Sequence, residues 1–216
     1  MALRDEIEDE RAALAESLEV VGPQARTACG DWTSFDLAAH VVASDRGFGV
    51  LAYCVRTLAA RGVPFHPDPR LVNLAIARQR RDGYPALLSQ IRQPCPRLLR
   101  STAVAAFTLF ELWMHHDDLT SANARAHGAP KHLALAIPSL VRYQTKRLPN
   151  ARLIVRTTDD YEWRFGPDDA SSVVLCGPAA DVVRWLAGRR TTESLSVDSD
   201  DVAVADLMRA FVGRIG

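Results

Sequence analysis

The chain has 216 residues, of which 48 % are hydrophobic and 24 % are charged, as in ordinary globular proteins with one large or two small domains. Basic and acidic residues number 26 each, so the formal net charge is zero, which argues against nucleic acid as a partner. No apolar run reaches the roughly 20 residues that span a bilayer, and the acidic, amphipathic N-terminus is unlike a signal peptide. We therefore expect a cytoplasmic protein that binds neither nucleic acid nor membranes.

The first part of the sequence predicts helices. Apolar residues recur every three, four or seven positions over 3–21, which marks one face of a helix that the Gly-Pro pair at 22–23 ends. A second helix is expected over about 35–60, with Thr33 or Ser34 as its N-cap. Further helices are expected over 70–81, 84–93, 101–125 and 129–147, the last with a kink at Pro138.

The pattern changes near residue 148 to the alternation that is typical of strands. Strands are expected over 152–157, 161–165, 171–177 and 194–199. One helix is expected over 178–189 and another over 202–213. The predicted fold class is α+β, with a helical bundle over 1–148 and a small α+β domain over 149–216.

The segment Glu-Leu-Trp-Met-His-His-Asp-Asp-Leu at 111–119 could carry chemistry. Glu111 and His115 are four residues apart and so share one face of the predicted helix, as does Asp118. A carboxylate and an imidazole at this spacing can bind one divalent cation. The same spacing also fits a surface ion pair that only stabilises the helix.

A third ligand could come from the second predicted helix. His40 shares a side with Leu37 and Val41 and therefore projects toward the bundle interior. Three protein ligands with open positions are the arrangement of a catalytic metal site. The alternative for His40 is a core histidine that hydrogen-bonds to a neighbour.

The remaining histidines and the cysteines give no strong indication of a functional site. His116 points away from the Glu111 face and is expected at the surface or at a domain contact, while His66, His127 and His132 are expected in solvent. The four cysteines form no CxxC pair, so free thiols are predicted rather than a zinc knuckle.

Three segments resemble the mycothiol-dependent maleylpyruvate isomerase family, whose N-terminal part is a DinB-like four-helix bundle. WTSFDLAAHVVASD at 32–45 is similar to the family signature Trp-Thr-x-x-Asp-Leu-x-x-His, and ELWMHHDDL is similar to its Glu-x-x-x-His-x-x-Asp segment. CGPAADVVRWLAGR at 176–189 resembles a run in the family's C-terminal domain. The double histidine followed by two acids is most similar to a short actinobacterial subgroup of metal-binding proteins with undefined activity.

The resemblance implies a divalent transition metal held by His40, Glu111 and His115, with mycothiol as the thiol cofactor. Zinc is the first choice of metal, and nickel, iron or manganese fit the same ligands. Asp118 would hold a ligand imidazole, or it is simply a carboxylate on the helix face. The C-terminal domain would be sterol-carrier-like.

The implied reaction is either isomerisation or S-transfer. An isomerase would add the thiolate to an activated cis double bond and release it after rotation, whereas a transferase would keep the thioether. The substrate would be a small electrophile with a carboxylate, anchored by a C-terminal arginine, for which Arg184, Arg189 and Arg190 are candidates. The alternatives are a non-catalytic metal-binding sensor or interaction module and, on fold analogy alone, a lipid-binding protein. The oligomeric state, monomer or homodimer, stays open.

Overall fold

The computed structural model describes residues 2–48, 54, 69–102, 104–144, 151–189 and 194–203. The chain forms two compact units, Met1–His132 and Leu133–Gly216. The first unit is helical and the second combines helices with a sheet, which confirms the predicted fold class. The predicted border between residues 148 and 149 lies outside the described residues. The described elements after residue 132 already group with the second unit.

The first two helices begin where the sequence predicts. α1 (Leu3–Val21) ends at Gly22, whose φ of 77° suits a residue without a side chain. α2 (Ser34–Ala43) starts at the N-cap Thr33, whose side chain accepts from the Asp36 amide. Asp36 in turn accepts from the Thr33 amide, so two backbone donors at the start of the helix are satisfied.

The second predicted helix is interrupted by a turn. Regular helix ends at Ala43 and passes into the wide turn η1 (Ser44–Phe48), in which Arg46 and Gly47 leave helical backbone angles. Gly47 has a φ of 108°, which only glycine adopts without strain. The single helix predicted over 35–60 is therefore interrupted at Arg46 and Gly47. Cys54 is helical as predicted, and the other residues after Phe48 lie outside the described part of the chain.

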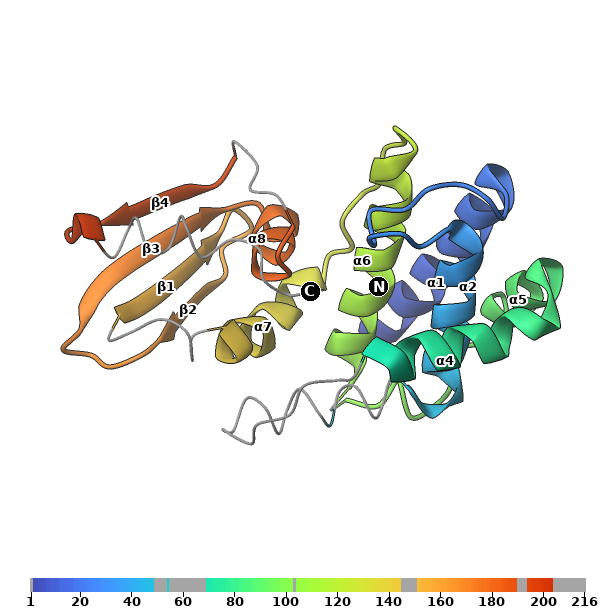
Figure 1. The fold of residues 1–216 in the computed structure, drawn as a ribbon. Coiled ribbons are helices and arrows are strands. Elements are labelled where there is room, and N and C mark those ends of the chain that lie inside the picture. Colours follow the sequence, from blue (N-terminus) through green and yellow to red (C-terminus); the bar gives the residue numbers. More distant parts are fainter. Residues whose placement is uncertain are drawn as a thin grey trace. The chain divides into compact units, whose positions relative to one another are not determined.

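The other helices of this unit match the expected ranges. They are α4 (Pro69–Gln79), the short η2 (Arg80–Asp82), α5 (Tyr84–Ile91) and α6 (Ala105–Ala122). α1 packs along α6, and α2 packs on α4 and α5 (Figure 1). Among the described residues, none of the helices combines the length and hydropathy needed to span a bilayer.

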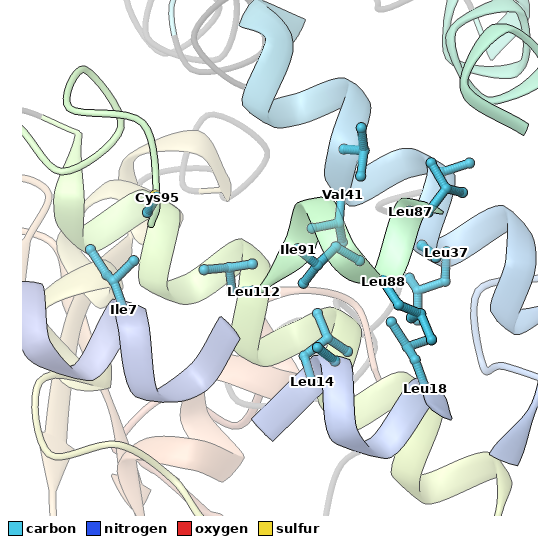
Figure 2. Close-up of a cluster of buried hydrophobic side chains, with 14 of the residues drawn as sticks. Ile7, Leu14, Leu18, Leu37, Val41, Leu87, Leu88, Ile91, Cys95 and Leu112 are labelled. Carbon is cyan, nitrogen blue, oxygen red and sulfur yellow. The ribbon is translucent and has the colours of Figure 1, made fainter. Parts of the chain in front are cut away.

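The core of the first unit gathers apolar side chains from α1, α2, α5 and α6, and Cys95 joins them (Figure 2). Burying a large aliphatic side chain contributes about 1.5–3 kcal/mol, so this cluster fixes α2 and α6 against α1. The labelled members are Ile7, Leu14, Leu18, Leu37, Val41, Leu87, Leu88, Ile91, Cys95 and Leu112.

The second unit begins with η3 (Leu133–Ala136) and α7 (Ile137–Gln144). The single helix predicted over 129–147 is thus divided, and Pro138 stands at the start of α7 rather than at a kink inside it. A proline is tolerated in the first turn because the amide it lacks has no partner there.

A four-stranded sheet completes the unit, and its strands confirm the predicted ones. They are β1 (Ala151–Thr157), β2 (Glu162–Phe165), β3 (Ser171–Gly177) and β4 (Ser196–Ser199), in the order β2-β1-β3-β4. β1 and β3 run parallel, and both outer pairs are antiparallel. The helix predicted over 178–189 is α8 (Ala179–Leu186), which contacts β3. Most of the closing helix predicted over 202–213 lies outside the described residues.

Candidate metal centre

The three predicted ligands come together in the first unit. One donor atom from each of His40, Glu111 and His115 lies within 4.8 Å of the other two. The four-residue spacing on α6 places Glu111 Oε2 3.9 Å from His115 Nε2. α2 supplies His40, whose ring centroid is 4.8 Å from that of His115. Two imidazoles and a carboxylate from two helices thus form a set, here called the open trio, and its role as a metal site stays a prediction.

Trp32 packs against both imidazoles of the open trio. Its ring centroid lies 5.0 Å from that of His40 and 6.3 Å from that of His115. The two residues of the Trp-Thr pair that precedes α2 therefore have different roles. Thr33 caps the helix, and Trp32 limits the rotation of the two imidazoles.

Cys29 and Asp118 lie on the other edge of the His115 ring. The Cys29 thiol donates to Asp118 Oδ2 at 2.9 Å and lies 3.7 Å from His115 Nδ1. Asp118 is 2 % exposed, and one donor atom of each of these three residues lies within 4.8 Å of the others. Asp118 is thus near the ring that it was predicted to hold. The sequence predicts Cys29 only as a free thiol. Its position three residues before Trp32, at the start of the Trp-Thr segment, was the available signal that it lies near the open trio.

A small cavity borders Glu111 and His115. Its wall contains the buried Arg11, which forms a two-pronged ion pair with Asp45 at 2.8 and 2.9 Å. Burial raises the pKa of Asp45, although the Arg11 guanidinium opposes that shift. The remaining lining residues are Val41, Ser44, Leu99, Phe107, Thr108 and Leu112.

The predicted substrate anchors belong to the second unit. Arg184 donates to Asp181 of its own helix at 2.8 Å, and Arg189 donates to the Ala187 carbonyl at 3.4 Å. Arg190 lies outside the described residues. Their role as carboxylate anchors stays a prediction, and Arg184 already has a carboxylate partner.

Two histidines are more buried than the sequence predicts. His116 was expected at the surface or at a domain contact and His127 in solvent, but their side chains are only 4 % and 8 % exposed. α6 contacts α1 as well as α2, so more than one of its faces is buried. Burial alone would lower the pKa of His127, but the carboxylates of Asp117 and Glu10 outweigh it and raise that pKa to about 9.

His132 also has a carboxylate partner. Its Nδ1 lies 2.8 Å from Glu6 Oε1, and its side chain is 25 % exposed, so it is only partly in solvent. His66 lies outside the described residues. All four cysteines are free, as predicted.

Residues 4–120 match the family model described as the mycothiol maleylpyruvate isomerase N-terminal domain. Two solved structures are similar to the chain, the mycothiol-dependent maleylpyruvate isomerase and a histidine-to-alanine mutant of it. Each shares 16 % identity and a TM-score of 0.54, over 92 % of this chain and 93 % of that chain. At this identity the likeness shows the fold. No curated protein sequence matches the chain.

Proposed function

The chain belongs to the mycothiol maleylpyruvate isomerase family, and from this premise we propose that it is a metal- and mycothiol-dependent enzyme. The proposed reaction is isomerisation or S-transfer on a small electrophilic substrate that bears a carboxylate. The convergence of His40, Glu111 and His115 from two helices carries this proposal.

The donor set fits a divalent transition metal. Imidazole and carboxylate together suit zinc, and they also accept nickel, iron or manganese. Three protein ligands leave positions for water or a small ligand. When bound, the metal would favour the thiolate form of a thiol, which is the nucleophilic form.

The residues around the open trio support the binding of a metal ion. The Cys29 sulfur lies 3.7 Å from His115 Nδ1 and donates to Asp118, while His115 Nε2 lies on the Glu111 side, where a metal would bind it. Trp32 packs on both imidazoles and restrains them. The side chains of Glu111 and His115 are 26 % and 15 % exposed and line a cavity, which supports access of a small molecule to this end of the open trio.

Metal content measured by elemental mass spectrometry on untagged protein tests the proposal. The His40→Ala/His115→Ala variant should hold one equivalent of metal less than the wild type. Mycothiol should then perturb the absorption spectrum of the cobalt-substituted wild type, and a thiol-dependent cis–trans isomerisation should be lost in the variant. A folded variant that keeps the full wild-type metal content would overturn the site.

A non-catalytic metal-binding module is the second candidate. The ion pair between Arg184 and Asp181 favours it, because an arginine already paired on its own helix is a weaker anchor for a substrate carboxylate. Under this alternative, mycothiol changes neither the cobalt spectrum nor the melting temperature. A response in either measurement favours the enzyme.

A further inference from the structure

The first unit contains a separate set of two imidazoles and one carboxylate. Glu10 comes from α1, His116 from α6, and His127 from the segment after α6. One donor atom of each lies within 4.8 Å of the other two. We propose that these residues, here called the buried trio, form a second site for a divalent transition metal.

One carboxylate oxygen of the buried trio contacts a nitrogen of each imidazole. Glu10 Oε1 lies 2.7 Å from His116 Nδ1 and 2.9 Å from His127 Nε2. The two imidazole centroids are 3.9 Å apart. The carboxylate therefore already touches both rings on the side where a shared cation would be bound.

Each imidazole also has an acceptor near its opposite nitrogen. His116 Nε2 lies 2.8 Å from the Ser17 hydroxyl. His127 Nδ1 lies 3.9 Å from Asp117 Oδ1 and has no hydrogen-bond partner within the described part of the chain. Metal-binding histidines usually direct their other N–H at a carboxylate or another acceptor, which fixes the tautomer. When the nitrogens facing Glu10 bind a metal, the protons move to the nitrogens facing Ser17 and Asp117.

Burial and charge favour a cation in this place. The side chains of Glu10, His116 and His127 are 9 %, 4 % and 8 % exposed. Two carboxylates, Glu10 and Asp117, flank His127 in this low-dielectric surrounding. A dication with two neutral imidazoles would balance both negative charges, and buried charges persist only where they are paired or bind metals.

The bound metal would have a structural role. The buried trio joins three parts of the first unit, and His127 is 117 residues from Glu10 along the chain. Since His116 directly follows His115, a metal on the buried trio would also fix the rotation of α6 that presents His115 to His40. Its ligands suit zinc, cobalt or nickel more than magnesium or calcium.

Cobalt titration of the chelator-treated protein tests the second site. The wild type should bind two Co²⁺ per chain, and His40→Ala/Glu111→Ala, which leaves His115 beside His116 intact, should still bind one. Adding Glu10→Gln to that variant should lower the remaining affinity at least about 100-fold, above the 10–100-fold that neighbours of ligands contribute. His132→Gln is the matched control, because it removes an imidazole–carboxylate pair between the same segment and α1 without touching either trio.

The outcomes separate the two sites. A wild type that saturates at one Co²⁺, lost in His40→Ala/Glu111→Ala but kept in Glu10→Gln, would overturn the buried site and leave a hydrogen-bonded network only. A wild type that saturates at one Co²⁺, kept in His40→Ala/Glu111→Ala but lost in Glu10→Gln, would overturn the open trio instead. The wild-type titration needs no buried substitution, and circular dichroism of each variant verifies its fold.

Discussion

The open and buried trios have the same donors, two imidazoles and a carboxylate, yet different surroundings. In the open trio, Glu111 and His115 border a cavity and are a quarter and a seventh exposed. In the buried trio no side chain is more than a tenth exposed, and Ser17 and Asp117 lie near the outer ring nitrogens.

Both trios take one imidazole from the His115–His116 pair of α6. Consecutive residues on a helix point about 100° apart, since 3.6 residues make one turn. His115 therefore meets α2, and His116 meets α1. The comparison indicates that the packing around a donor set, rather than its composition, decides whether a metal there can meet a substrate.

The largest expected effect is the loss of metal binding and activity at the open trio alone. His115→Ala should lower metal affinity at the open trio by more than about 100-fold, since loss of a ligand exceeds the effect of its neighbours. Thiol-dependent activity should fall in parallel, and the fold should remain because the hydrophobic core lies elsewhere. Cobalt titration and a turnover assay measure both effects, and a variant that keeps wild-type activity would contradict the assignment.

The next effect concerns stability and belongs to the buried trio. In the presence of chelator, Glu10→Ala should destabilise the protein by about 3 kcal/mol, because it leaves two buried imidazoles without their carboxylate. Urea denaturation at pH 7 measures this change. Glu19→Ala on the same helix removes an exposed pair with Arg92 and should cost less than about 1 kcal/mol. Equal costs for the two variants would contradict the importance of burial.

A smaller effect on metal affinity is expected from Asp118 and Cys29, which lie beside the His115 ring. Asp118→Asn should weaken the metal at the open trio about 10–100-fold and leave the buried trio unchanged. Cys29→Ser keeps a donor to Asp118 and should change the affinity only a few-fold. Competition with a chromophoric chelator gives both affinities, and an unaltered Asp118→Asn affinity would remove this residue from the site.

The smallest effect acts on the helix that carries His40. Burial opposes ionisation of Asp36, but hydrogen bonds from Thr33 and Arg80 outweigh it and lower its pKa from the ordinary 3.8. The stability that the carboxylate contributes is therefore present above pH 3.8 and is lost as the pH falls through the lowered pKa. Asp36→Asn should cost about 1 kcal/mol at pH 7 and progressively less in acid. Urea denaturation at several pH values checks this trend, and a constant difference would contradict it.

The sequence predicted the open trio because periodicity and motif agree there. Glu111 and His115 follow helical spacing, and His40 lies in a segment that resembles a family signature. It did not predict the buried trio, because His127 comes from an irregular segment where spacing carries no information. One signal was present, since Glu10 lies three residues after Ile7 and four before Leu14, on the apolar face of α1.

The fold was predicted best where the hydrophobic pattern and the residues that begin or end an element agree. Gly22 ends α1, Thr33 begins α2, and alternating residues mark the strands. The second helix was predicted as continuous because its apolar spacing continued, and the break at Gly47 was missed. The hydrophobic pattern of α6 alone could not predict that helices pack on two of its faces. This packing explains why His116 is buried although it was expected at the surface or at a domain contact.

The last ten residues of the first unit supply partners that a fragment of this unit needs. His127 and His132 pair with Glu10 and Glu6, which are only 8 % and 2 % exposed. A fragment that stopped at the end of α6, close to where the family match stops, would bury both carboxylates without these partners. Removing one partner of a buried ion pair costs about 3–5 kcal/mol, much of the stability of a small domain. An expression fragment should therefore extend to residue 132.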